Sequence, residues 1–207
     1  MNPGPWVQRL VWMLWLGLPI LAGCATVPAN IDHACILLDG RDDWYDSLRA
    51  SEKKWGVPTH VQLAIIHQES KFRSDAKPSR IKWLGFIPGP RPSSAYGYAQ
   101  ALDDTWAWYK AKSGNSWADR DNFEDAVDFI GWYVDVTYKT LGLSKSDAKS
   151  QYLAYHEGHG GYKKKTFLKK PWLMQVADKV AERAANYKKQ LRLCDNHQNK
   201  RSTLSLF

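Results

Sequence analysis

The 207-residue sequence predicts a mainly helical domain with at most a small β-hairpin. Two observations lead to this fold class. Apolar residues recur three or four positions apart in several segments, which is the spacing of one face of a helix. No stretch has the sustained period-two alternation of a half-buried strand, and no internal repeat is visible.

Start and stop signals divide the chain into six predicted helices. They cover residues 41–55, 58–70, 103–112, 122–142, 144–158 and 171–193. The breaker at residues 56–58 separates the first two. The fourth helix closes with Gly142, and the fifth has Ser144 as its expected cap with Asp147 three residues later.

The start of the chain has the features of a secretory signal. Residues 1–23 carry one charge, Arg9, followed by an apolar run of 14 residues that is short for a bilayer span. The following "LAGC" resembles the lipobox of bacterial lipoproteins, which implies acylation of Cys24 and a membrane anchor through N-terminal lipid. An ordinary signal with a chance cysteine is the alternative. Ala25 replaces the aspartate of the inner-membrane retention signal, so we expect the periplasmic side of the outer membrane.

Two further cysteines lie near the ends of the mature chain. In an oxidising compartment, Cys35 and Cys194 predict one disulfide that closes a very long loop. Two free buried thiols are the alternative. No CxxC motif or Cys/His cluster supports a metal site, and we expect no cofactor.

The chain is basic, with a formal net charge of +8, of which Arg9 in the signal accounts for one. A basic secreted protein favours acidic partners such as peptidoglycan carboxylates or lipid phosphates, and nucleic acid is a poor candidate in that compartment. The richest basic cluster is Lys163–Lys165 with Lys169 and Lys170, and a solvated loop is its alternative reading. The many tryptophans suit both a core and the apolar faces of sugar rings.

Glu69 lies where the helical pattern of residues 58–70 calls for an apolar side chain. It follows Val61 and Ile65 at i, i+4 and i+8, so it shares their stripe. A carboxyl group on an apolar stripe is desolvated, which raises its pKa toward the range of a general acid. The alternative is a partly exposed glutamate at a fraying helix end, or one paired with an arginine.

Residues 73–97 contain several prolines and glycines, so they are not expected to form a helix. They also contain the apolar residues Trp83, Leu84, Phe86 and Ile87. Such residues on a loop usually bury beneath it or contact a partner. We expect a loop that packs on its own domain, and a flap over a cleft is the alternative.

Three short motifs follow one another in the chain. They are Glu69-Ser70 at a predicted helix end, Gly97-Tyr98-Ala99-Gln100, and Ala154-Tyr155 followed by His156. In this order they resemble the lytic transglycosylases of the soluble, goose-lysozyme-related type, over roughly residues 55–190. The resemblance implies a lysozyme-like α+β fold, with any small β-hairpin near the cleft. The expected layout is a signal at 1–23, an anchor and tether at 24–40, the transglycosylase domain at 41–195 and a mobile tail at 196–207.

The resemblance also implies roles for individual residues. Glu69 would be the catalytic acid, and the expected substrate-binding residues are Ser70, Tyr98, Gln100, Tyr155 and His156. Three features depart from the family pattern. Tyr98 and Ala99 replace a Leu-Met pair, His156 replaces an asparagine, and the stretch between the first two motifs is longer than usual.

The implied activity is non-hydrolytic cleavage of peptidoglycan between N-acetylmuramic acid and N-acetylglucosamine. One glutamate acts first as acid and then as base, and the product ends in a 1,6-anhydro ring, whereas a hydrolytic glycosidase normally needs two carboxylates. Second carboxylates near the motifs are Asp75, Asp103, Asp104 and Glu157. A hydrolytic muramidase and a catalytically silent peptidoglycan-binding lipoprotein of the same fold are therefore the alternatives.

Overall fold

We describe a computed structural model over residues 28–204, with side chains to residue 194. The described helices are α2 (Ala34–Leu38), α3 (Asp42–Trp55), α4 (Thr59–Ser70), α5 (Asp103–Ser113), α6 (Phe123–Leu141), α7 (Ala148–Lys163), the short 3-10 helix η1 (Thr166–Lys169) and α8 (Pro171–Leu204). The strands β1 (Lys82–Trp83) and β2 (Ile87–Pro88) form one antiparallel hairpin. The predicted mainly helical fold with a small hairpin is confirmed.

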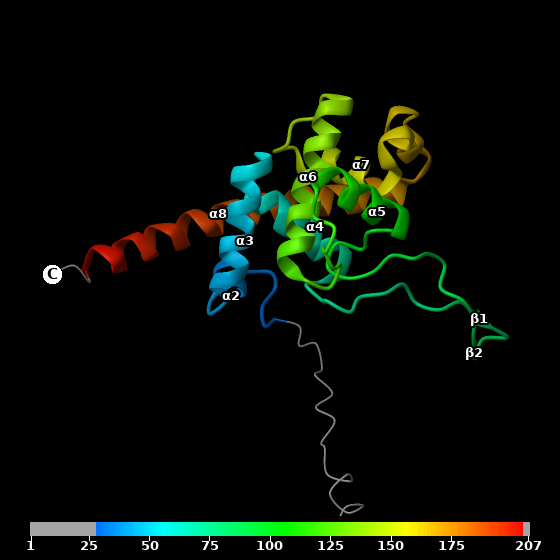
Figure 1. Cartoon of the computed structure of the whole chain (residues 1–207), viewed down its shortest axis with the longest axis horizontal. Coiled ribbons are helices and arrows are strands. Elements are labelled where there is room, and N and C mark those ends of the chain that lie inside the picture. Colours follow the sequence, from blue (N-terminus) through cyan, green and yellow to red (C-terminus); the bar gives the residue numbers. More distant parts are fainter. Residues whose placement is uncertain (1–27, 205–207) are drawn as a thin grey trace, which may run out of the picture.

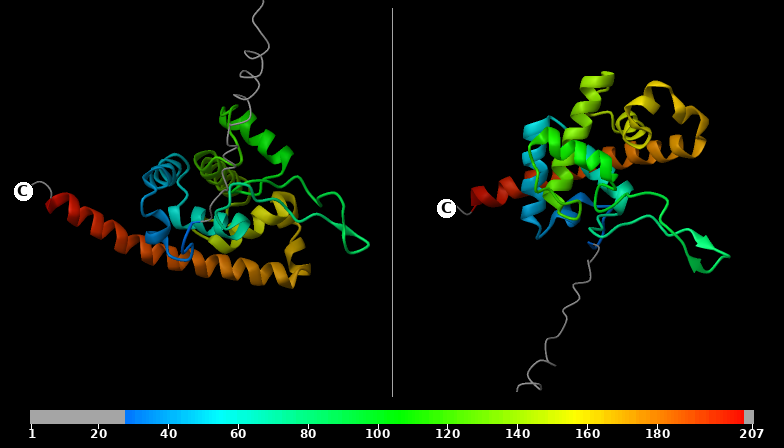
Figure 2. Two further views of the ribbon diagram at one scale, coloured as in Figure 1. Left: turned by 90° about the horizontal axis from the view of Figure 1, so that it is seen from below. Right: turned by 45° about the vertical axis from the view of Figure 1, so that its right-hand side comes forward.

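Helix α4 lies inside the helical assembly. It contacts α3, α6, α7 and α8, and α8 runs along the length of the body beneath the other helices (Figure 1, Figure 2). The side chains buried on α4 come from every face of the helix: Thr59, Val61, Gln62, Leu63, Ala64, Ile65, Ile66, His67 and Ser70. A helix that is apolar nearly all round is typical of a core position. The predicted stripe of Val61 and Ile65 is buried, but as part of a fully enclosed helix.

Helices α3 and α6 approach each other closely at Gly131. A Cβ atom added there would lie 2.4 Å from Ser51 Oγ and 2.6 Å from the Trp55 ring. On the same side of α6, Ser51 donates a hydrogen bond to the Val127 carbonyl at 3.1 Å. The missing side chain of Gly131 therefore sets how near the two helices can pack.

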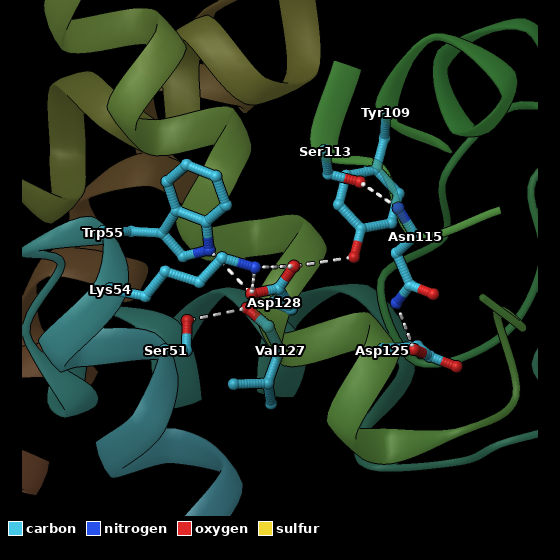
Figure 3. Close-up of polar contacts among 9 residues, drawn as sticks. All are labelled: Ser51, Lys54, Trp55, Tyr109, Ser113, Asn115, Asp125, Val127 and Asp128. Carbon is cyan, nitrogen blue, oxygen red and sulfur yellow. Dashed lines mark hydrogen bonds and ion pairs between the residues drawn. The ribbon is translucent and has the colours of Figure 1, made fainter. Parts of the chain in front are cut away.

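Asp128 ties α3 and α5 to α6, as Figure 3 shows. Its carboxylate accepts hydrogen bonds from Lys54 Nζ at 2.9 Å, from Trp55 Nε1 at 2.7 Å and from the Tyr109 hydroxyl at 2.8 Å. The Trp55 and Tyr109 donors are partly buried, where an unsatisfied donor is costly, whereas Lys54 is exposed. One carboxylate thus satisfies three donors from two neighbouring helices.

A disulfide joins Cys35 to Cys194, the pair that the sequence suggests, with Cα atoms 5.8 Å apart. It attaches α2 to α8, and Ala34 and Leu37 of α2 are buried in the core. The folded domain therefore begins before residue 41, and treating all of residues 24–40 as tether was wrong. Apolar side chains on one turn are enough to bring this segment into the core.

The last helix also differs from the sequence prediction. α8 continues to Leu204 rather than ending near Leu193, so residues 196–204 of the expected mobile tail are helical. No proline or glycine occurs between residues 194 and 204 to stop it. In α7 the cap is Asp147, whose carboxylate accepts from the Ser150 amide, and not the expected Ser144.

The β1–β2 hairpin lies at the end of a long loop that projects from the helical body in both views (Figure 1, Figure 2). Lys82 pairs with Pro88 and Trp83 with Ile87. The apolar side chains of this loop are exposed, from 41% for Ile87 to 82% for Leu84. The expectation that the loop packs on its own domain was wrong, because the prolines and the turn carry these side chains away from the core.

Residues 1–27 and 205–207 lie outside the described residues, so the predicted signal and Cys24 do too. Within residues 28–204, no helix has the length and apolar character needed to cross a membrane. The buried core extends from Ala34 to Tyr187, and the disulfide closes at Cys194. A chain of residues 25–207 therefore contains the whole folded core.

The close contact at Gly131 generates a stability prediction. Gly131→Ala should lower the free energy of unfolding by about 1–3 kcal/mol, because the methyl group overlaps Ser51 and Trp55 and forces α3 from α6. Gly160→Ala in α7 is the matched control, since its Cβ meets nothing within 4 Å. Urea unfolding of both variants checks this. Equal stability of the two variants would contradict the packing described here.

Candidate active site

The end of α4 places Glu69 at the edge of the core. The helix stops at Ser70, where Lys71 takes a left-handed conformation and its amide bonds to the His67 carbonyl. Phe72 also has a positive φ of 60° and is buried, 1% exposed, with its ring stacked on Trp44. Two successive non-glycine residues in this conformation are unfavourable on their own. The packing of Phe72 holds this sharp turn and with it the position of Glu69.

Glu69 lines a cavity of about 430 Å³, which is in the size range of ligand sites. The walls come from α4, α6, α7, the start of α5 and the segment before it. The lining residues are Glu69, Ala95, Gln100, Ala101, Leu102, Thr105, Phe129, Tyr133, Tyr155, His156, Glu157 and Gly158. Apolar and aromatic walls with a few polar groups are typical of small-molecule and sugar sites.

Burial of Glu69 raises the pKa of its carboxyl from 4.5 to about 7. A hydrogen bond from Tyr152 and the charge of Lys71 oppose this rise by favouring the carboxylate. Desolvation wins, so near neutral pH the group is present in both protonation states. A carboxyl group in this condition can donate a proton and later accept one.

Two tyrosines of α7 lie beside Glu69, and they have different partners. The Tyr152 hydroxyl bonds with the Glu69 carboxyl. The Tyr155 hydroxyl donates at 2.6 Å to the Ala99 carbonyl, so it joins α7 to the segment that carries Gln100. Burial raises the pKa of both phenols, which keeps them protonated donors.

Tyr152 is not among the site residues expected from the sequence, whereas its neighbour Tyr155 is. A signal was present, because Tyr152 and Tyr155 are three residues apart and share one face of α7. Sequence spacing does not tell which of two neighbouring hydroxyls reaches the acid. The relative rotation of α4 and α7, set by packing, decides this.

Gln100 lies in the cavity wall at a tight turn. Its φ is 49°, and its Nε2 donates to the Ala76 carbonyl at 2.8 Å and to the Gly97 carbonyl at 2.9 Å. Gly97 also has a positive φ, and a Cβ there would lie 1.9 Å from the Arg120 carbonyl. Only glycine fits at this position, which explains the spacing of the glycine and glutamine in the motif.

Two of the expected substrate-binding residues do not reach the cavity. Ser70 is buried, and its hydroxyl donates to the Ile66 carbonyl at 3.3 Å. The Tyr98 ring packs edge-on against Trp44 and Phe123 on the other side of its segment. The structure therefore brings Glu69, Gln100, Tyr155 and His156 together and leaves Ser70 and Tyr98 outside.

Glu157 is the second carboxylate in the cavity wall. Burial opposes its ionisation, but hydrogen bonds from Lys170, Thr166 and His156 outweigh burial and lower its pKa to about 2. Lys170 Nζ lies 2.7 Å and His156 Nδ1 3.0 Å from Glu157 Oε1. With its side chain 3% exposed, Glu157 serves to fix His156 and η1 in place.

The other candidate carboxylates lie away from the cavity. Asp75 pairs with Arg73, Asp103 pairs with Arg120, and neither they nor Asp104 line it. Among the described residues, no group of three or more His, Cys, Asp or Glu side chains is arranged to hold a metal ion. Glu69 is therefore the acid whose surroundings match proton transfer within this cavity.

The chain matches a protein-family model. The model described as "Transglycosylase SLT domain" matches residues 12–194, which is most of the chain. No curated protein matches the sequence. The lysozyme-like fold expected from the three motifs is confirmed, and the match suggests a lytic transglycosylase that binds peptidoglycan. The chain belongs to the transglycosylase SLT domain family.

Proposed function

We propose that this chain is a membrane-bound lytic transglycosylase with Glu69 as its single acid and base. Its substrate would be the β-1,4 bond between N-acetylmuramic acid and N-acetylglucosamine in peptidoglycan. The observation that carries the proposal is the burial of Glu69 in the cavity, which raises its pKa to about 7. The family match supplies the substrate class.

In the first step, protonated Glu69 donates its proton to the glycosidic oxygen that leaves N-acetylmuramic acid. The bond from that oxygen to C1 breaks, positive charge develops at C1, and the acetamido oxygen of the same sugar stabilises it. Glu69 becomes a carboxylate in a poorly solvated site. The hydrogen bond from Tyr152 favours this ionised form.

In the second step, the Glu69 carboxylate accepts the proton of the C6 hydroxyl of the same sugar. The C6 oxygen bonds to C1 and closes the 1,6-anhydro ring, so no water is consumed and Glu69 regains its proton. The state of Glu157 supports this route over hydrolysis. Its carboxylate is held by Lys170 and Thr166 and is buried, which makes it a poor base for an attacking water.

The cavity walls offer groups that suit a glycan. Phe129 and Tyr133 present aromatic surface, and Gln100 carries an amide carbonyl that can accept from a sugar hydroxyl or acetamide. His156 adds a ring edge beside Trp172 at 5.3 Å between centroids. Gln100, Tyr155 and His156 are our proposed binding residues, with Tyr155 acting by holding the Ala99 carbonyl.

The product analysis tests the central claim. Residues 25–207 should release fragments from purified peptidoglycan that end in 1,6-anhydro-N-acetylmuramic acid, seen by mass spectrometry. Glu69→Gln should lower the release rate by roughly 10²–10⁴-fold, because the amide cannot donate the proton. Glu124→Gln, an exposed glutamate on α6, is the matched control and should keep full activity.

The other outcomes of this assay identify the alternatives. Fragments with reducing ends would mean hydrolysis, and a water-activating carboxylate would then be required. Binding of peptidoglycan without release of fragments by the parent chain would mean a silent binding module. Unchanged release by Glu69→Gln would remove Glu69 from the catalytic role.

The pKa of Glu69 predicts how activity depends on pH. Since the acid must start protonated, kcat/KM should fall about tenfold per pH unit above roughly pH 7. Tyr152→Phe removes a hydrogen bond that lowers this pKa, so the midpoint of the fall should move to higher pH. Tyr138→Phe, at an exposed tyrosine of α6, is the control and should leave the midpoint unchanged. An unchanged pH midpoint in Tyr152→Phe would contradict the assignment of Glu69 as the acid.

The anchor proposal concerns residues outside the described part of the chain. Cleavage before Cys24 and acylation of its sulfur would hold the domain at the periplasmic face of the outer membrane. Mass spectrometry of the N-terminal peptide from cells expressing the whole chain should find a lipid-modified Cys24. Cys24→Ser should abolish this modification, and an unmodified N-terminus in the parent would contradict the proposal.

A further inference from the structure

The projecting hairpin exposes five large apolar side chains next to one another. This surface, the hairpin tip, consists of Ile81, Trp83, Leu84, Phe86 and Ile87, with exposed fractions of 47%, 59%, 82%, 75% and 41%. None of them lines the cavity around Glu69. Contiguous exposed apolar residues on a soluble domain usually mark a contact surface.

The hairpin is an ordered element. The Ile81 amide donates to the Pro90 carbonyl at 3.0 Å, and the Gly89 amide donates to the Ile81 carbonyl at 2.6 Å. A Cβ on Gly89 would lie 3.1 Å from Trp83 Nε1, so the indole rests on this glycine. These contacts fix the tip residues as a group.

Leu84 is at the turn of the hairpin in a left-handed conformation, with φ of 51°. This conformation is unfavourable for leucine, and the side chain gains no burial in return. Neither local propensity nor packing within the domain accounts for a leucine here. A partner that covers the side chain would.

Basic residues surround the tip. Lys77, Arg80, Lys82 and Arg91 lie in its two legs, and no aspartate or glutamate occurs between residues 76 and 102. Arg80 and Arg91 donate to the backbone carbonyls of Gly89 and Pro78, and Lys77 lies over the Tyr96 ring. Within the described chain, none of the four forms an ion pair, so their charges remain available to an anionic partner.

We propose that the hairpin tip inserts into the headgroup region of an anionic phospholipid bilayer. Tryptophan, phenylalanine and leucine favour the boundary between headgroups and acyl chains, and lysine and arginine just behind them attract lipid phosphates. The surface combines both features on one projecting element. This contact is separate from the chemistry of Glu69 and from any lipid on Cys24.

A sugar chain fits the tip less well. Sugar sites combine aromatic faces with directed polar groups, and leucine and isoleucine side chains at the tip provide none. Binding to an anionic bilayer requires only apolar surface with positive charge behind it. The charge pattern also selects anionic over neutral lipid.

Vesicle sedimentation with residues 25–207, which lack Cys24, tests the proposal directly. The parent should bind phosphatidylglycerol-containing vesicles, and the double variant Trp83→Ala/Phe86→Ala should bind at least about tenfold more weakly. Trp117→Ala is the matched control, because Trp117 is 92% exposed elsewhere on the molecule. Circular dichroism melting should be the same for all three, since the tip lies outside the core.

A charge variant separates the lipid headgroup from other partners. Arg80→Glu/Lys82→Glu should also bind at least about tenfold more weakly, whereas Lys164→Glu, in the exposed basic cluster at the end of α7, should bind nearly like the parent. Equal binding of parent and tip variants would overturn the proposal. So would equal binding to pure phosphatidylcholine, or no binding by the parent, which would point to a protein partner. Digestion of peptidoglycan in solution should not change, so failure here is distinct from failure of the transglycosylase proposal.

Discussion

The structure depends on the burial of most of α4. A helix with apolar side chains on every face has to be surrounded, and α3, α6, α7 and α8 enclose it. Because Glu69 lies in the last turn of this helix, the same enclosure removes water from its carboxyl and raises its pKa. The burial of apolar side chains that stabilises the fold therefore also raises the pKa that suits Glu69 to acid chemistry.

Helix α6 connects the core around α4 to the wall of the cavity. One side of it is held to α3 and α5 through Asp128, and its other side supplies Phe129 and Tyr133 to the cavity wall. Tyr133 in turn lies edge-on to Tyr155 at 5.1 Å between ring centroids. The aromatic wall of the cavity is thus an extension of the core.

The sequence predicts which side chains are buried, because burial follows from the spacing of apolar residues. It does not predict contacts that depend on how one helix is rotated against another. The stripe through Val61 and Ile65 is buried, and the desolvation that it predicted for Glu69 agrees with the raised pKa of that carboxyl. The partner of that carboxyl depends on how α7 is turned, and the motif resemblance pointed to Tyr155 although Tyr152 makes the hydrogen bond. The packing prediction for the loop at residues 73–97 was wrong for another reason. An apolar composition predicts that the loop contacts something, but it does not say whether the partner is its own domain or another molecule.

Gln100 connects the cavity to the projecting hairpin. Its Nε2 bonds to the Ala76 and Gly97 carbonyls, which lie at the base of the two legs, and the Gly97 amide bonds back to Ala76 at 3.0 Å. The leg from Ala76 to Leu84 can span at most about 26 Å, given about 3.3 Å per residue. If the tip rests in a bilayer, this length fixes how far above the lipid the cavity can lie, so the hairpin would restrict Glu69 to glycan strands close to the membrane.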